Sequence, residues 1–185
     1  MNHVANDALT DAMTDAMTDA TNDGARIAAY REVRARIDAL LADETDWIAA
    51  LSTVVCELHH SFAHYDWTGF YRAVTPDLLA VGPYQGTHGC LRIPFTRGVC
   101  GAAARTQTTQ LVPDVHARAD HIACSGSTQS EIVVPLISPE GRTLAVLDID
   151  SDTLAAFSAV DQRELESLCR SLAQRFPDGE QTQRR

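Results

Sequence analysis

The sequence predicts an α+β protein with one folded domain. Three observations indicate this class: two segments with helical hydrophobic spacing come first, a run of short antiparallel strands follows, and an amphipathic helix closes the chain. The chain has 185 residues, of which 45% are hydrophobic. This is enough for one globular domain with a proper core.

The first 24 residues form an acidic, low-complexity tail that we expect to be disordered. An aspartate recurs at every fourth position from Asp7 to Asp23, and the repeat TDAMTDAMTDAT contains three of these five. A helix would stack these like charges on one face. The tail has no Lys or Arg and no sizeable apolar face. We therefore expect a single domain over residues 25–177 and a flexible C-terminus over 178–185. An interaction tail is the alternative to a solvated extension.

Three helices are expected from apolar residues that recur at spacings of three and four. Two open the domain, over Ile27–Leu41 and Trp47–Phe62, and the acidic segment 43–46 between them is suited to cap the second. The third is capped at Ser158 and ends near Phe176.

The middle of the chain is typical of short strands and turns. A helix of small residues, Gly98–Gln107, interrupts the strands. The expected strands are Trp67–Val74, Leu78–Gly86, Cys90–Phe95, Thr109–Val115, Glu131–Ile137 and Thr143–Asp150.

The last two strands place three acids together. In TLAVLDID, strand alternation puts Asp148 and Asp150 on one face with Leu144. A tight turn at residues 138–141 would oppose residues whose numbers sum to 281, so that Glu131 lies opposite Asp150. We predict that the three acids line one rim of a pocket, where a close pair could hold a proton near neutral pH. They could also bind a ligand's ammonium group. Solvated acids at a strand end are the alternative.

Composition excludes several classes of function. The net charge of −10 argues against a nucleic-acid partner. No apolar run approaches the length of a membrane span, and no secretory signal is visible. The absence of lysine excludes Schiff-base chemistry and a P-loop lysine.

The chain has five cysteines, an odd number that points to the reducing cytoplasm. No C-x-x-C occurs, so we expect no metal site. Cys56 and Cys169 lie in apolar helical patterns, and we expect both to be buried packing residues. Cys124 lies in the polar stretch DHIACSGSTQSEIVVP, which favours a reactive thiol. His121 could lower the pKa of that thiol, or could be a solvated bystander.

Four segments together resemble the free methionine-(R)-sulfoxide reductases, a family of GAF domains: GCLRIPFTRGVCG, VPDVHARADHIAC, SEIVVPL and LAVLDIDS. WTGFY and GPYQG match as well, and the resemblance covers roughly residues 40–176. A glycine motif alone would be weak evidence. Three cysteines at separations of ten and twenty-four residues, followed by the acids, are specific. The stretch SGSTQ after Cys124 departs from the family pattern, which leaves the contacts of that loop open.

The resemblance implies a profilin-like GAF fold, in which helices flank a central antiparallel sheet. It implies thiol-dependent reduction of free methionine-(R)-sulfoxide, and not of methionine within proteins. Cys124 would attack as a thiolate and become a sulfenic acid, which Cys90 would resolve as a disulfide. Cys100 would be a candidate second resolving cysteine, with simple packing as the alternative.

The resemblance also assigns the binding residues and partners. Glu131, Asp148 and Asp150 would hold the substrate and polarise its sulfoxide. Trp67 and Tyr71 would lie near its methyl group, although strand aromatics are more often core residues. A thioredoxin-like dithiol would reset the enzyme, no cofactor or metal would be needed, and the chain would form a homodimer.

Two other kinds of function remain open at this point. The chain could be a GAF module that senses a small molecule, a common use of that fold. It could also be a redox-sensing or structural partner protein whose cysteines switch an interface.

Overall fold

The computed structural model describes residues 4–117 and 126–179, and it describes side chains from residue 22 onward within these ranges. Two helices precede a run of strands that one helix interrupts and another closes. The elements are α1 (Val4–Leu40), α2 (Trp47–Ser61), β1 (Trp67–Thr75), β2 (Leu78–Gln85), β3 (Arg92–Pro94), α3 (Gly98–Thr106), β4 (Gln110–Val112), a short 3-10 helix (Val115–Ala117), β5 (Ser130–Ile137), β6 (Thr143–Ser151) and α4 (Ala159–Arg175).

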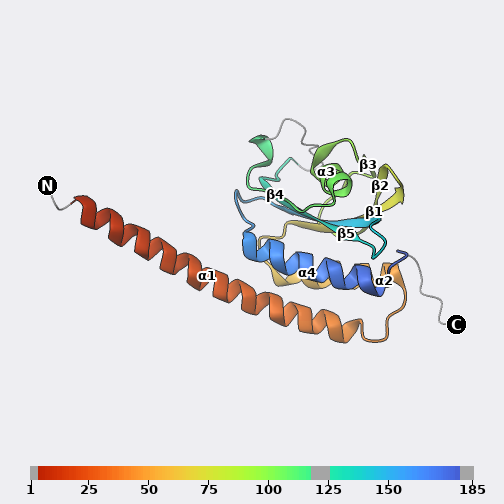
Figure 1. The fold of residues 1–185 in the computed structure, drawn as a ribbon, viewed down its shortest axis with the longest axis horizontal. Helices are drawn as coiled ribbons and strands as arrows, with labels where there is room; N and C mark the ends of the chain where they lie inside the picture. Colours follow the sequence, from red (N-terminus) through yellow and green to blue (C-terminus); the bar gives the residue numbers. More distant parts are fainter. Residues whose placement is uncertain (1–3, 118–125, 180–185) are drawn as a thin grey trace.

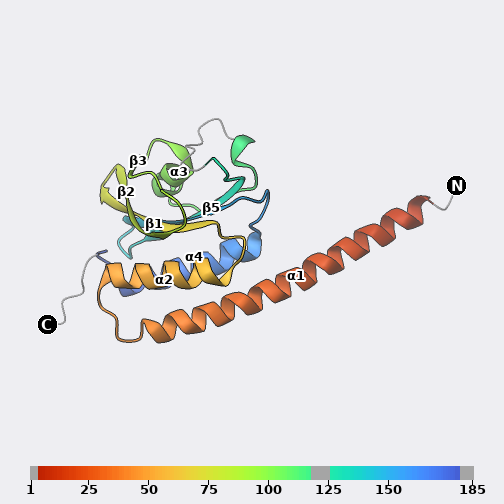
Figure 2. The ribbon, with the colours of Figure 1, turned by 180° about the vertical axis from the view of Figure 1, so that it is seen from behind.

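Six strands form one sheet in the order β3-β2-β1-β6-β5-β4, and every neighbouring pair is antiparallel. Figure 1 shows α2 and α4 on one face of the sheet, with α1 packed beneath them, and α3 on the opposite face. Figure 2 shows the same layers from behind. The predicted class, an α+β fold with helices flanking an antiparallel sheet, is confirmed. No helix in the described ranges is long and apolar enough to cross a membrane.

The hydrophobic core has two parts, one on each face of the sheet. The larger cluster joins α1, α2 and α4 to strand residues such as Leu147 and Ile149. The smaller cluster lies under α3 and includes Val146 and Val133. Because strand side chains alternate, the even-numbered acids that follow Val146 on β6 belong to the α3 face.

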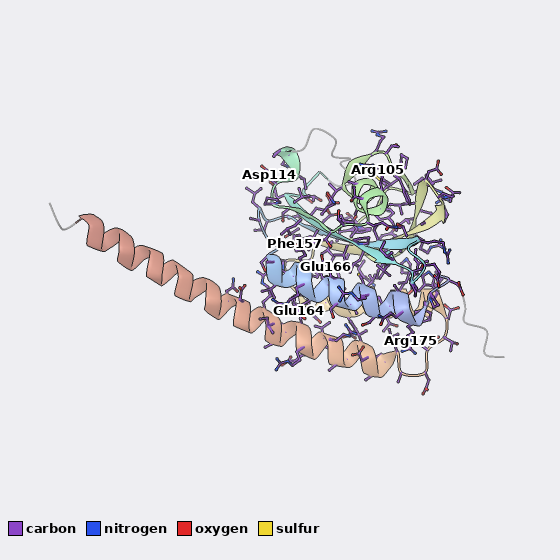
Figure 3. All side chains as sticks on the ribbon, viewed as in Figure 1. Arg105, Asp114, Phe157, Glu164, Glu166 and Arg175 are labelled. Carbon is purple, nitrogen blue, oxygen red and sulfur yellow. The ribbon has the colours of Figure 1, made fainter. Side chains whose placement is uncertain are left out.

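The helix ends follow the predicted signals. Asp46 is the N-cap of α2 and accepts a hydrogen bond from the backbone of Ala49 at 2.8 Å. Ser158 caps α4 in a reciprocal capping box with Asp161. At the other end of α4, labelled in Figure 3, Arg175 donates hydrogen bonds to two carbonyl oxygens of the turn between α1 and α2.

Helix α1 continues back to Val4, through the segment in which we expected disorder. The alanines of this segment favour a helix, and its first part projects beyond the rest of the domain (Figure 1). The first buried side chain in the described part of α1 is Tyr30, whose hydroxyl donates to Asp161 on α4 at 2.8 Å. The domain boundary at residue 25 stays a prediction, and residues 180–185 of the expected flexible C-terminus lie outside the described residues.

The prediction for Cys56 was wrong, whereas that for Cys169 is confirmed. Cys169 is buried, but Cys56 is exposed on the outer face of α2. Val54 and Val55 are buried, and Cys56 follows them directly in sequence. Successive helical residues turn by about a quarter of a circle, so Cys56 points away from the core that its neighbours contact.

The prediction for Leu144 was also wrong, because it packs in the helix-side cluster and not beside Val146. The register between β5 and β6 shifts at this point: Ile137 pairs with Thr143, whereas Leu136 pairs with Ala145. Leu144 is the extra residue of this bulge, and a bulge interrupts the simple alternation of faces.

Candidate active site

Two neighbouring strands bring the three predicted acids to the face that α3 covers. Strands β5 and β6 pair Glu131 with Asp150, which confirms the predicted register, and they pair Val133 with Asp148. Residues two apart on a strand share a face, so all three acids project toward α3. Glu131 and Asp148 are buried, and Asp150 is half-buried.

Cys100 approaches the acids from α3. Its thiol donates a hydrogen bond to Asp148, and the side chain of Glu131 is also hydrogen-bonded to Asp148. One sulfur or carboxylate oxygen atom from each of these three buried residues lies within 4.8 Å of the other two. The sequence contains no local spacing that shows this contact, because it depends on how α3 packs over the sheet.

This cluster holds protons more tightly than isolated carboxyls do. Burial raises the pKa of Asp148 to about 6, while its hydrogen bonds with Cys100 and Glu131 act in the opposite direction. Burial also raises the pKa of Asp150, and nearby carboxylates, Asp148 first among them, add to the effect. Two carboxyls in hydrogen-bond contact need a proton between them, because two carboxylates would repel. The pair can therefore present a proton to an oxygen atom of a ligand.

The thiol of Cys100 is kept protonated. Burial raises its pKa, and the nearby carboxylates of Asp148 and Glu131 raise it further. A thiol is a much weaker nucleophile than a thiolate. Cys100 is therefore poorly suited to attack a substrate directly.

Trp67 and Tyr71 stand beside the acids on β1. Trp67 pairs with Asp150 across β1 and β6, so its indole projects from the acid face, and Tyr71 lies four residues further along the same face. The two rings stack with their centroids 5.8 Å apart, and Tyr84 on β2 also stacks with Trp67 at 5.4 Å. The three rings form an aromatic stack that borders the acid cluster.

Two glycines make room for this stack. A Cβ atom at Gly69 would lie 2.5 Å from the Trp67 ring and 2.6 Å from Cβ of Tyr84. A Cβ atom at Gly89 would lie 2.9 Å from both the Trp67 ring and the Tyr71 hydroxyl. Tyr84 was not among the predicted site residues, although the hairpin register that pairs it with Gly69 places it on this face.

Cys90 lies in the loop between β2 and β3, half-buried and disulfide-bonded. Its backbone N–H donates a hydrogen bond to the Tyr71 hydroxyl, which holds the loop against the aromatic stack. Cys124 and His121 lie outside the described residues. The structure thus brings together seven of the eight predicted site residues: Trp67, Tyr71, Cys90, Cys100, Glu131, Asp148 and Asp150.

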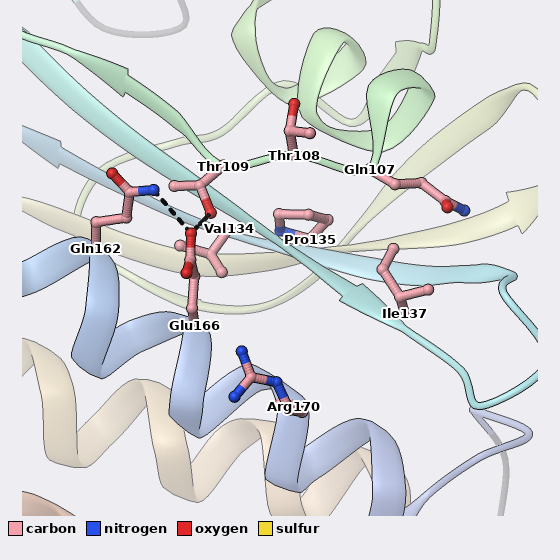
Figure 4. A pocket seen from close by; sticks show the side chains of 9 residues that line it. All are labelled: Gln107, Thr108, Thr109, Val134, Pro135, Ile137, Gln162, Glu166 and Arg170. Atoms are coloured by element: carbon pink, nitrogen blue, oxygen red, sulfur yellow. Dashed lines mark hydrogen bonds between the residues drawn. The ribbon is translucent and has the colours of Figure 1, made fainter.

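A separate hollow of about 430 Å³ lies at the edge of the sheet, between β5, α4 and the loop after α3 (Figure 4). Glu166 in this hollow accepts hydrogen bonds from Thr109 at 2.6 Å and from Gln162 at 2.9 Å. Its carboxylate thereby ties α4 to the segment that leads into β4. The residues that line the hollow include none of the predicted site residues.

The chain is similar in sequence to GAF domains and to proteins named free methionine-R-sulfoxide reductase. A family model described as GAF domain matches residues 7–176. The free methionine-R-sulfoxide reductase of Saccharomyces cerevisiae is 42% identical over 139 residues, covering 72% of this chain and 77% of the yeast protein. The protein of the same name from Escherichia coli is 38% identical over 143 residues, covering 77% of this chain and 86% of its own.

A solved structure is similar over most of the fold. It is the X-ray structure of free methionine-R-sulfoxide reductase from Neisseria meningitidis in complex with its substrate. It matches with a TM-score of 0.78 at 47% sequence identity, covering 82% of this chain and 90% of that chain.

Proposed function

The chain belongs to the GAF-domain family, among the free methionine-R-sulfoxide reductases, and from this membership we propose that it reduces free L-methionine (R)-S-oxide to methionine with thiols as the reductant. The observation that carries the proposal is the buried contact of Glu131 with Asp148 beside the aromatic stack. A free amino acid brings an ammonium group that such acids can bind, whereas a methionine residue inside a protein has none.

The proposed reaction has four steps. The thiolate of Cys124 attacks the sulfoxide sulfur, because the thiolate is the nucleophilic form of cysteine. Oxygen passes to Cys124 as a sulfenic acid and methionine leaves. The thiol of Cys90 condenses with the sulfenic acid, which releases water and forms a disulfide. A thioredoxin-like dithiol then restores both thiols by exchange.

The state of the cysteines supports the pairing of Cys90 with Cys124. Cys90 is disulfide-bonded, whereas Cys56, Cys100 and Cys169 are free thiols. The partner of Cys90 is therefore none of these three, and we propose Cys124, as the family resemblance implies. For Cys100 we propose at most a secondary resolving role, because burial keeps its thiol protonated.

The acids and aromatics take complementary roles in the proposal. The sulfoxide oxygen must gain a proton to leave sulfur, and the proton held between Glu131 and Asp148 can supply it. Asp150, which is half-buried at the rim, can accept hydrogen bonds from the substrate's ammonium group. The rings of Trp67 and Tyr71 offer an apolar surface for the methyl group.

The test is consumption of free methionine-R-sulfoxide by the purified chain with dithiothreitol, measured beside the S epimer. We expect turnover of the R epimer only, lost in Cys124→Ser. The matched control is Cys56→Ser, which removes an exposed thiol outside the site and should turn over normally. No turnover by well-folded protein would contradict the proposal and favour a GAF module that binds a small molecule without converting it.

We further propose that the chain acts as a cytoplasmic homodimer. Odd cysteine usage supports the reducing compartment. Light scattering after size exclusion should give twice the chain mass of 20.1 kDa, and a monomer at that mass would contradict the dimer.

A further inference from the structure

We infer that Cys100, Glu131 and Asp148 also form a binding site for a thiophilic divalent cation of the Zn²⁺ or Cd²⁺ type. The three side chains come from α3, β5 and β6, three elements that pack against one another. Each residue offers one ligand atom within 4.8 Å of the other two, and all three residues are buried. The packed fold, and not a flexible surface segment, therefore sets the positions of the donors.

The spacing is close to that of a coordinated ion. With Zn–S near 2.3 Å and Zn–O near 2.1 Å, tetrahedral sulfur and oxygen ligands lie roughly 3.6 Å apart. From separations of at most 4.8 Å, the side chains need to close by about 1 Å, which small rotamer adjustments allow. A water molecule can complete the four ligands.

Asp148 provides a second observation that points to a cation. Asp148 is 6% exposed, and apart from its contacts with Cys100 and Glu131 inside the cluster, its Oδ1 atom has no hydrogen-bond partner in the part of the chain that the structure describes. A buried carboxylate oxygen without a partner is costly. A bound cation would remove that cost.

The donor set selects the kind of ion. Ca²⁺ takes six to eight oxygen ligands, and Mg²⁺ keeps several waters in an octahedral shell, so a buried set of three donors that includes a thiol suits neither. One thiolate and two carboxylates suit Zn²⁺ and Cd²⁺. Binding displaces two protons into solvent, the thiol proton of Cys100 and the proton held between Glu131 and Asp148. These ligands are far apart in sequence. The expectation of no metal site was based on closely spaced cysteines, a pattern that cannot detect such a set.

The consequence for activity rests on the proposed function. The acids that would hold the substrate are two of the three ligands, so Zn²⁺ and free methionine sulfoxide would compete for one place. Zn²⁺ would then be a competitive inhibitor. The metal site itself rests on the geometry of the cluster and can be tested without turnover.

The experiment is a Cd²⁺ titration of the Cys56→Ser protein with the proposed Cys90–Cys124 disulfide closed, so that Cys100 and Cys169 are the free thiols among the described residues. We expect a thiolate-to-cadmium charge-transfer absorption in the ultraviolet that saturates at one ion per chain and that Zn²⁺ reverses. An excess of Mg²⁺ should not change it. The further change Cys100→Ser should abolish the absorption, and Glu131→Gln should weaken binding at least tenfold, while Cys169→Ala should leave it intact.

An absorption that persists in Cys100→Ser, or that is absent at all Cd²⁺ concentrations, would overturn the proposal. Circular dichroism establishes that each variant is folded. If Cys100→Ser does not fold, an undiminished affinity in Glu131→Gln overturns the proposal equally. Cd²⁺ binding without any sulfoxide turnover would contradict the proposed function and leave the metal site standing.

Discussion

At the scale of single residues, the contact between Glu131 and Asp148 determines what the site can do. Two carboxyls in a buried place share a proton more readily than they both ionise. The raised pKa of Asp148, about 6, follows from burial and puts that proton in the range where an enzyme can use it. The burial of this pair in the packed fold thus makes its proton available for the proposed reaction.

Replacing Glu131 with Gln tests this role. The amide keeps the shape and the hydrogen-bonding capacity but cannot exchange a proton, so we expect turnover to fall roughly 10²- to 10⁴-fold with little change in thermal unfolding. Steady-state kinetics and circular dichroism measure the two effects. The control is Glu140→Gln, an exposed acid in the turn between β5 and β6. Unchanged turnover in Glu131→Gln would remove the acid pair from the mechanism.

His64 gives a prediction for pH dependence. It packs against the rings of Phe62, Tyr65 and Phe157, and its Nε2 atom has no hydrogen-bond partner in the described ranges. Burial, and then the nearby charge of Arg26, lower its pKa below 6.5, although the carboxylates of Asp161 and Asp66 act in the opposite direction. The folded state therefore binds this proton less tightly than the unfolded state does.

The stability that neutral His64 gives is complete above pH 6.5 and is lost as the pH falls through the lowered pKa. His64→Phe keeps a ring and removes the titration. We expect the melting temperature of the variant, relative to that of the original protein, to rise as the pH is lowered from about 8 to about 5.5. If the difference in melting temperature between the two proteins stays constant over this pH range, His64 does not contribute to the pH dependence of stability.

At the scale of elements, the sequence predicts strands and registers well where local rules apply. The hairpin turn placed Glu131 opposite Asp150, as the structure has it. The face of Cys56 could have been predicted from helical geometry, but its apolar neighbours in sequence were misleading. The bulge at Leu144 and the contact of Cys100 with Asp148 could not be predicted, because both depend on packing between elements distant in sequence.

Helix α3 packs closely against the backbone of the segment that precedes it, and Gly101 is the α3 residue at this contact. A Cβ atom at this position would lie 2.6 Å from the carbonyl oxygen of Pro94 and 3.0 Å from that of Phe95. Backbone oxygens cannot move aside cheaply, so Gly101→Ala should displace α3, lower the stability by about 1–3 kcal/mol and misplace Cys100.

Urea unfolding and turnover measure the effect of Gly101→Ala. The matched control is Gly126→Ala, where a Cβ atom meets nothing within 4 Å of it. An unchanged urea midpoint in Gly101→Ala would mean that α3 adjusts without strain, which would contradict a tight contact between Gly101 and the carbonyl oxygens of Pro94 and Phe95.

At the scale of the whole molecule, α1 has two parts. Its second half is fixed to the domain, because Tyr30 and Arg26 both bond to Asp161 on α4. Its first half projects away from the sheet and from the site (Figure 1). Deletion of residues 1–24 should therefore leave kcat/KM and the melting temperature unchanged.

Turnover and thermal unfolding of the shortened chain check this prediction. Tyr30→Phe serves for comparison, because loss of its buried hydrogen bonds should lower stability by about 1–3 kcal/mol without changing the site. A large loss of turnover on deletion would contradict the prediction and show that the acidic tail takes part in the activity.

The central claim is that Cys124 takes oxygen from free methionine sulfoxide and that Cys90 resolves the product. The most direct test is a single turnover of fully reduced chain with the R epimer and no external thiol, followed by methionine quantification and peptide mapping of disulfides. We predict one methionine per chain and a disulfide that joins the peptides containing Cys90 and Cys124. Methionine formed with a different cysteine pair, or no methionine from folded reduced protein, would contradict the account.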